Sequence, residues 1–587
     1  MANSEETYRT LCSSETLRSG KKGFFHEFSE HVLECAGDSW TTKIFGRLDE
    51  DEARIRAIFT DAKIKEVVLE TLSKTQTVFR DKDAEVSRHR RLEAFQLAAS
   101  GQREKALLLL SQAVLRAPTA GKCQTVDQGF SLALALLGRA EIFIALKEYD
   151  RALDDLNLAS AEYGVLPRLA CGKNPALPEA SVKLEIRETV MAGKHAVAAE
   201  TIQPGDVLVV ERPTAACLLP EFFGTHCQHC FSRYRAPIGC PECSSVAFCS
   251  KACRDIAIST YHKYECKILA LLIGSGMSVL SLVALRMVTQ EGCASVNSYE
   301  LVMHEKIRQP KDFLERTLMA AFLLKCLQRV KFFGNPSKDD GVPNEDEIAV
   351  GALILKNLQL LQFNAHEFFE TRLGLEHRFR GSKPVYLGVA IYPTVARFNH
   401  DCYPAVTRYF VGRNIVIRGT RVLQAGDVIA ENYGPIFTKR NLQERQRTLA
   451  GRYWFRCTCK ACQEDWPGFA KLTNDFTRLR CPTQACKHLH GRPHAGEEKK
   501  SIKCPTCRKK ITLEAAATRL LECELLYARG FSEMDEEKPQ QAIGTLIEAM
   551  KKFHEIAVVP HKDTHLAEIA LSACMADSGN TWRATLQ

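Results

Sequence analysis

The sequence has little that would direct a chain into or across a membrane, and we expect no such segment. Its first residues, Met1 to Glu6, supply no positively charged stretch followed by an apolar one, so we expect no secretion signal. One uncharged run, 268–285, has 18 residues, the lower limit for a membrane span, but it contains three serines and two glycines. We therefore interpret this run as a buried helix and expect a protein of the cytoplasm and nucleus.

A complete glycine loop for binding a dinucleotide is also missing. Gly274 and Gly276 follow an apolar run, as such a loop would, but Val279 stands at the position of the third glycine. No alternation of strands and helices surrounds these residues. Glycines in a tightly packed helix explain the pattern better than nucleotide binding does.

Composition sets the scale of the molecule. With 587 residues, of which 45% are hydrophobic, the chain can bury a large core and should fold into several domains. The net charge of +9 is spread over a long chain, so it permits an acidic partner without requiring one. Because we expect a reducing compartment, we interpret the 24 cysteines as thiols or thiolates. We expect a monomer that contacts no membrane.

Eight metal-ligand residues lie between positions 227 and 266, spaced C-x2-C twice, then C-x3-C and H-x3-C. Zinc takes four thiolate or imidazole ligands, so they predict two closed structural sites with no open position for catalysis. Disulfides or buried thiols are the alternative. Interleaving the pairs gives two sets: Cys227, Cys230, Cys249 and Cys253 on one zinc, and Cys240, Cys243, His262 and Cys266 on the other. With its closing segment 261–266, the run resembles the MYND zinc finger.

Helical patterns dominate the chain before the zinc ligands. Residues 1–85 suggest mixed helices with charged faces. Residues 86–170 contain two helix-turn-helix units whose paired helices resemble tetratricopeptide repeats. An ordinary helical bundle fits the same periodicity equally well. In either case we expect the first eighty residues, the later domain or both to cover the apolar faces of these helices.

Strand patterns flank the zinc ligands. Residues 182–186 alternate in polarity, residues 205–210 follow a Gln-Pro-Gly turn, and short strands return between 386 and 433. A helical stretch separates the zinc ligands from the later strands. Strands on both sides of an insertion imply one β-rich domain that is split in sequence.

The second half of this domain carries the motifs with chemical content. Residues 397–402 read Arg-Phe-Asn-His-Asp-Cys, a strand pattern follows and leads to Tyr433, and the segment 453–462 contains C-x-C-x2-C. The Asn-His-x-Cys motif with the later tyrosine resembles the SET domain of protein-lysine methyltransferases, and the cysteine-rich segment resembles its post-SET zinc segment. With the inserted finger, the chain resembles the SET and MYND family, and its helical repeats point to the tetratricopeptide-bearing member of that family.

This resemblance implies the transfer of a methyl group from S-adenosylmethionine to a lysine side chain of a protein substrate. The enzyme must align donor and neutral amine and exclude water, and an apolar, aromatic channel favours the neutral amine by desolvation. By resemblance, Tyr433 lies nearest the transferred methyl group, Tyr453 is the second channel tyrosine, and Phe455 packs on cofactor and lysine.

The resemblance also assigns the cofactor contacts. The expected residues are Gly193, Lys194, His195, Asn364, Asn399, His400, Tyr433 and Phe455. The loop 193–195 has one glycine where the family commonly has two, and Asp401 replaces the usual serine. The altered loop favours a second hypothesis, in which the chain is a catalytically weak or inactive scaffold, or a transcriptional corepressor adaptor.

Two further zinc sites are predicted. By resemblance, one set consists of Cys402, Cys457, Cys459 and Cys462. The spacings C-x4-C and C-x2-C predict another set, with free thiols as the alternative: Cys481, Cys486, Cys504 and Cys507. Both zinc ions would be structural, and the first would build part of the lysine channel.

The leading hypothesis is therefore an S-adenosylmethionine-dependent protein-lysine N-methyltransferase that acts on histones or non-histone proteins. The resemblance implies that the finger binds short proline-containing peptides and meets corepressors such as histone deacetylases. Basic residues at 499–500 and 508–510 weakly suggest nucleic-acid contacts, but solvated charge explains them better, and we expect no nucleic-acid partner.

The expected fold class is multidomain α+β: a β-rich split SET domain with an inserted MYND finger and helical insert, a post-SET zinc segment, and tetratricopeptide-like helical regions at both ends. The expected boundaries are 1–85 for N-terminal helices, 86–170 for repeats, 181–226 and 381–436 for the two SET parts, 227–266 for the finger, 267–380 for the helical insert, 450–466 for the post-SET segment, 478–510 for a zinc ribbon and 511–587 for C-terminal helices.

Overall fold

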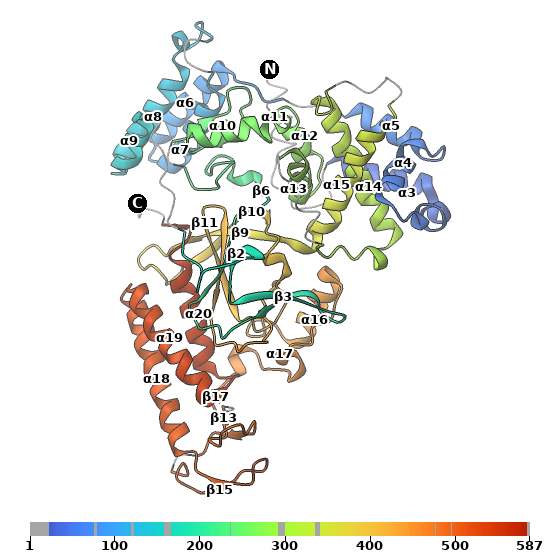
Figure 1. Ribbon diagram of the computed structural model, residues 1–587. Helices are drawn as coiled ribbons and strands as arrows, with labels where there is room; N and C mark the ends of the chain where they lie inside the picture. The colour runs from blue at the N-terminus through green and yellow to red at the C-terminus, as the bar shows by residue number, and fades with distance from the viewer. Residues whose placement is uncertain are drawn as a thin grey trace.

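The computed structural model describes residues 23–75, 79–118, 122–157, 166–234, 236–290, 300–334, 341–475, 477–494 and 496–583. Helices and strands are mixed, as the sequence predicts (Figure 1). The predicted N- and C-terminal regions lie partly outside the described residues.

The first three described helices pack against the helical insert. They are α3 (Phe24–Lys43), α4 (Asp51–Thr60) and α5 (Lys65–Lys74), and Figure 1 places them beside α14 (Pro310–Arg329) and α15 (Glu345–Asn364). Phe24 meets Phe322 at a ring-centroid distance of 5.1 Å, and Arg56 pairs with Glu345 at 2.7 Å. Their apolar faces are thus covered by a segment more than 200 residues away in sequence.

Four helices in two hairpins follow: α6 (Ala84–Ala99), α7 (Arg103–Arg116), α8 (Ser131–Ala145) and α9 (Tyr149–Asn157). A small residue lets them approach closely, because a Cβ on Gly138 would lie 2.6 Å from the ring of Phe95. Arg139 and Asp155 form a buried ion pair that joins α8 to α9. Paired helices with a glycine at the crossing agree with both expectations for this region, repeat and bundle.

The strands before and after the finger share two sheets. The five-stranded sheet has the order β1 (Lys173–Asn174), β2 (Leu177–Ser181), β5 (Val207–Glu211), β12 (Asn414–Gly419) and β11 (Val406–Val411). The four-stranded sheet has the order β18 (Thr581–Trp582), β9 (Ala365–Arg372), β10 (Lys383–Ile391) and β6 (Ala215–Leu218). A hairpin of β3 (Leu184–Thr189) and β4 (Gly193–Ala198) lies beside them. Antiparallel pairs β5–β12 and β6–β10 join segments about 170 to 200 residues apart, so one β-rich unit is built from two pieces of chain.

The inserted segment begins with the finger, which contains β7 (Ile238–Gly239), β8 (Ala247–Phe248), α10 (Lys251–Ser259) and α11 (His262–Glu265). Residues 268–285 then form two helices, α12 (Leu269–Gly274) and α13 (Val279–Thr289), so the prediction of one buried helix is wrong. Gly276 breaks the run with a φ of +84°, a conformation that favours glycine. In the described part of the chain, no helix is long and apolar enough to cross a membrane.

The C-terminal part packs on the β-rich unit from the other side. It contains α16 (Leu442–Tyr453), α17 (Lys460–Gln463), the short strands β13 (Arg478–Arg480), β14 (Leu489–Gly491), β15 (Ile502–Lys503) and β16 (Lys510–Ile511), then α18 (Glu514–Asp535), α19 (Pro539–Ile556), β17 (Ala557–Val558) and α20 (Lys562–Ala576). The chain then returns to the sheet, where β18 pairs in parallel with β9. A second apolar cluster, separate from the main core, gathers around Cys402 and the three C-terminal helices.

Candidate active site and zinc centres

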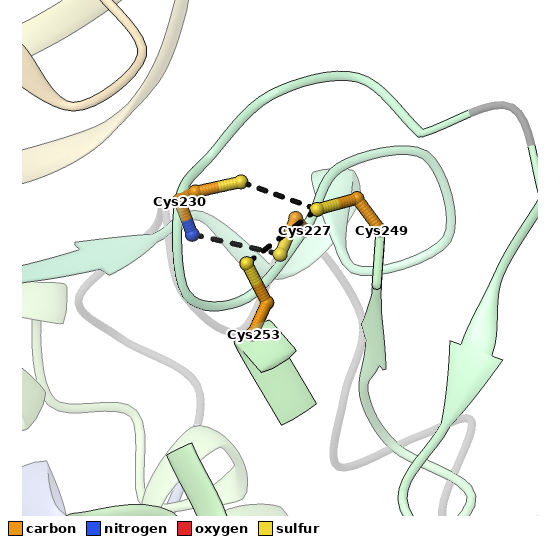
Figure 2. Close-up of side chains that lie close together, drawn as sticks. All are labelled: Cys227, Cys230, Cys249 and Cys253. Atoms are coloured by element: carbon orange, nitrogen blue, oxygen red, sulfur yellow. Dashed lines mark hydrogen bonds between the residues drawn. The ribbon is translucent and has the colours of Figure 1, made fainter. Parts of the chain in front are cut away.

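The finger brings its eight predicted ligands together in the two interleaved sets that the spacing predicts. In each set the ligand atoms lie within 4.8 Å of one another, and all eight residues are buried. Figure 2 shows the first set, in which Cys249 Sγ lies 3.5 Å from the sulfurs of both Cys230 and Cys253. In the second set, Cys243 Sγ lies 3.5 Å from His262 Nε2. Four sulfur or imidazole donors at such distances have the composition of a closed zinc site.

Local structure explains how the first set is positioned. Ser250 caps α10 by accepting a hydrogen bond from the backbone N–H of Cys253 (3.2 Å), which fixes Cys253 in the first helical turn. Cys230 donates its backbone N–H to Cys227 Sγ (3.5 Å), as a knuckle turn requires (Figure 2). The finger is therefore formed by two short turns and a helix start, each set by its own sequence.

A third ligand set joins two segments that are far apart along the chain. Cys402 Sγ lies 3.5 Å from Cys462 Sγ and 4.0 Å from Cys457 Sγ, and Cys459 completes the set. The buried Arg445 on α16 donates to Cys462 Sγ (3.6 Å), which orients this cysteine within the set. The segment after Asn399-His400 is thus held against the segment that follows Tyr453.

The fourth predicted set also assembles. The Sγ atoms of Cys481 and Cys507 are 3.9 Å apart, and those of Cys486 and Cys504 are 3.8 Å apart. All four sulfurs lie within 4.8 Å of one another. His488 is outside the set, and its Nδ1 lies 3.1 Å from the hydroxyl of Thr506. The cysteines alone therefore supply a full tetrahedral donor set, and the nearby histidines are not needed as ligands.

The three predicted catalytic aromatic residues lie close together. The ring centroids of Tyr433 and Tyr453 are 4.9 Å apart, and those of Tyr433 and Phe455 are 6.4 Å apart. The hydroxyl of Tyr433 donates to the carbonyl of Phe398 (2.8 Å), and the hydroxyl of Tyr453 donates to the carbonyl of Tyr433 (3.2 Å). Burial raises the pKa of Tyr433, so the phenol stays protonated at neutral pH.

His400 connects the aromatic group to the third ligand set. Its Nδ1 accepts the backbone N–H of Tyr433 (3.0 Å), and its Nε2 lies 3.2 Å from Cys402 Sγ. Burial lowers the pKa of His400 to about 4, so the ring is neutral at pH 7. Because Nδ1 accepts, the proton lies on Nε2 and points to the sulfur, an arrangement that orients a metal ligand.

The other predicted cofactor residues are each held by specific contacts. Asn399 Nδ2 donates to the carbonyl of Ala192 (2.9 Å), so the Asn-His motif contacts the loop 193–195. In that loop Gly193 has a φ of +61° and open space where a Cβ would lie, His195 is buried with Nδ1 2.9 Å from the Gly193 carbonyl, and Lys194 pairs with Glu300. The amide of Asn364 donates to the carbonyls of Val302 (2.7 Å) and Leu360 (2.8 Å).

A cavity of about 120 Å³ opens beside Tyr433, Tyr453 and Asn364. Its wall differs from the apolar channel that the sequence predicts, because ionisable groups share it with the aromatic rings. The lining also includes Phe363, His366, Glu367, Tyr386, Arg408, Glu431 and Arg452. Tyr433 and Tyr453 therefore line one cavity, and its wall combines aromatic with charged side chains, unlike the apolar, aromatic channel expected from the sequence.

The charges in this wall are paired. Glu431 is 4% exposed, and its two carboxylate oxygens lie 2.9 Å from His366 Nε2 and 2.8 Å from Arg408 Nη1. Burial alone would raise the pKa of Glu431, but the pairing with His366 and Arg408 outweighs it and holds this pKa below its usual range. Sequence reasoning missed this network, because its three members come from β9, β11 and the segment after β12, and no local motif links them.

Comparisons with known proteins agree with this geometry. The family model described as "MYND finger" matches residues 227–266. The chain is 23% identical to protein-lysine N-methyltransferase SMYD4 of Danio rerio over 66% of this chain and 63% of the relative, and 23% identical to SMYD4 of Mus musculus over 70% and 61%. It is 23% identical to N-lysine methyltransferase SMYD2 of Homo sapiens over 50% of this chain and 63% of the relative.

The MYND finger and the relatives named SMYD4 and SMYD2 are findings of one kind, because all of them support the SET and MYND family for this chain. The chain spans a little more than three fifths of the length of the SMYD4 relatives that it matches.

Proposed function

We propose that this protein is an S-adenosylmethionine-dependent protein-lysine N-methyltransferase. The observation that carries the proposal is the third ligand set, which holds the Asn399-His400 motif and the Tyr453–Phe455 segment around Tyr433 and its cavity. The names of the relatives, protein-lysine and N-lysine methyltransferases, support the same reaction class.

The residues of this site fit a cationic methyl donor. The ring centroids of Tyr433, Phe455 and His400 lie within 6.4 Å of one another. Aromatic faces attract a sulfonium, and the neutral imidazole of His400 does not repel it. When bound, S-adenosylmethionine supplies an electrophilic methyl group on a positively charged sulfur. Asn399, His400 and the loop 193–195 would hold it, with Phe455 covering the ring side.

The protein's own contribution is positioning. The hydroxyl of Tyr433 is fixed on the Phe398 carbonyl and that of Tyr453 on the Tyr433 carbonyl, so both rings keep one orientation. A rigid aromatic pair leaves one path along which an amine can approach the methyl group, and such alignment is the main demand of an in-line displacement. Zinc ions in the four ligand sets would hold this arrangement without taking part in the reaction.

Partner binding belongs to the same proposal. The finger would bind short proline-containing peptides, corepressors such as histone deacetylases among them, and α6–α9 and α18–α20 would act as tetratricopeptide-like surfaces that select substrates in cytoplasm and nucleus. The adaptor alternative depends on the loop 193–195, with its single glycine. Calorimetric titration with S-adenosylmethionine separates the two, since an adaptor that has lost the cofactor shows no binding at millimolar concentration.

Replacing Tyr433 by phenylalanine tests the proposed enzyme. The change removes one hydroxyl and leaves the Phe398 carbonyl without that donor, a cost of about 1 kcal/mol that the fold can tolerate. We expect Tyr433→Phe to bind cofactor but to lose transfer of a labelled methyl group onto cell-extract proteins. Tyr527→Phe is the matched control, because it removes a buried hydroxyl in α18 that lies 3.1 Å from Thr564. Equal labelling by wild type and Tyr433→Phe would refute the role of Tyr433.

A further inference from the structure

The cavity beside the catalytic tyrosines contains a buried histidine whose second nitrogen is unsatisfied. His366 is 8% exposed, its Nε2 lies 2.9 Å from the Glu431 carboxylate, and its Nδ1 is buried without a hydrogen-bond partner in the described part of the chain. A buried acceptor without a donor costs about 1–3 kcal/mol. This position therefore suits a ligand that brings a proton.

The pairing with Glu431 fixes which nitrogen can act. The ionised carboxylate accepts from Nε2–H, so the neutral ring has its lone pair on Nδ1. Arg408 occupies the other carboxylate oxygen at 2.8 Å, which holds Glu431 in place from the opposite side. A carboxylate that orients an imidazole in this way also stabilises the imidazolium that forms when Nδ1 takes a proton.

A lysine side chain arrives at such a site protonated, because its ordinary pKa is about 10.4. The amine must lose one proton before its lone pair can attack the methyl group. Tyr433 and Tyr453 cannot accept this proton, since both phenols are protonated and burial raises both pKa values. The other ionisable groups of the cavity wall are Glu367 on β9, Tyr386 on β10, Arg408 on β11 and Arg452 on α16. Of these, only Glu367 has a carboxyl group, and its side chain is exposed to solvent.

We propose that His366 accepts, at Nδ1, the proton that the substrate ammonium loses before methyl transfer, and that Glu431 is the positioning residue that orients it. The inference rests on the proposed methyl transfer and deepens it. One N–H bond of the ammonium breaks and one Nδ1–H bond forms. The neutral amine then forms its bond to the methyl carbon as the carbon–sulfur bond breaks, the sulfur keeps that electron pair, and the imidazolium returns its proton to water after product release.

The test is the pH dependence of labelled methyl transfer by the full-length, zinc-loaded chain, with tritiated S-adenosylmethionine and heat-treated cell-extract proteins as acceptor. We expect His366→Gln to lower kcat/KM about 100-fold at pH 7.5. We also expect this deficit to shrink about tenfold by pH 8.5, because the substrate amine then loses its proton to water in a larger fraction of molecules. Wild type should level off over the same range, while the variant keeps rising.

Two further variants make the result specific. Glu431→Gln should shift the acidic limb of the wild-type profile to lower pH, because an imidazolium without its carboxylate has a lower pKa. This second variant keeps the test decisive if His366→Gln fails to fold. His561→Gln is the matched control, since His561 is buried beside Glu524 (3.6 Å) in the C-terminal helices, and it should leave the profile unchanged.

A loss of activity by the same factor at every pH, or no loss, would overturn the assignment of His366, because a structural role does not follow the protonation of the substrate. Calorimetry separates this failure from that of the proposed function. Wild type that neither binds S-adenosylmethionine nor transfers a methyl group would refute the methyltransferase itself, and the inference with it.

Discussion

Replacing Cys402 by serine tests whether a metal holds the candidate active site together. Cys402 and Cys457 are 55 residues apart in sequence and 4.0 Å apart in space. If a zinc ion joins them, the loop-closure entropy of such a cross-link stabilises the assembled segment by about 4 kcal/mol. Loss of the cross-link lowers the equilibrium ratio of the assembled to the released segment by at most about 1000-fold. The segment is still held in part, because Tyr403, Phe437 and Trp466 pack together beside the site.

Native mass spectrometry and calorimetry give the readout. We expect Cys402→Ser to bind one zinc ion fewer than wild type, to bind S-adenosylmethionine weakly and to lose methyl transfer, while the finger keeps its metal. Cys574→Ser is the matched control, because Cys574 is buried but belongs to none of the four ligand sets, and it should keep every zinc ion. A Cys402→Ser protein with the wild-type zinc count and full cofactor affinity would refute the cross-link.

Two further predictions concern stability. Burial raises the pKa of Glu211 to about 7 from its usual 4.5, although its oxygens accept the N–H groups of Thr394 and Val395, so its contribution is complete below pH 4.5 and is lost as pH rises through 7. The thermal midpoint of wild type should fall from pH 5.5 to 8 more steeply than that of Glu211→Gln, and parallel curves would contradict this. Gly138→Ala should destabilise α6–α8 by about 1–3 kcal/mol, because the new Cβ meets Phe95 at 2.6 Å. Gly544→Ala should instead stabilise α19 by up to about 1 kcal/mol, because the space around its Cβ is open. Hydrogen exchange measures the stability of each region, and the same change in both variants would contradict the packing argument.

The sequence was most informative where chemistry is local. Cys227 and Cys230 are close because two residues separate them, and the demand of zinc for four ligands then restricts how the pairs combine. The contact between Cys402 and Cys457 could not be derived in that way, because nothing in the spacing of either segment points to the other. It came from the resemblance to a family, and the geometry agrees with it.

Prediction failed where tertiary packing decides. The pattern of α3–α5 indicates a face to be buried, but not that α14 and α15 cover it. The composition of the apolar run 268–285 is compatible with one continuous helix. The chain nevertheless turns at Gly276, so that two short helices pack in one core. Glu431 and His366 are 65 residues apart and belong to no shared motif, so their buried pair is visible only in three dimensions.

The third ligand set, the Asn399-His400 motif and the charged wall of the cavity form one mechanical unit. Glu431 donates its backbone N–H to the Asn399 carbonyl (2.9 Å) and accepts from the N–H of Asp401 (2.8 Å), so its backbone is tied to the segment that ends in Cys402. Its side chain meanwhile holds His366 and Arg408. A displacement of Cys402 would therefore move the oriented histidine as well as the cofactor residues. A metal bound to the third ligand set would therefore influence the candidate site through structure alone.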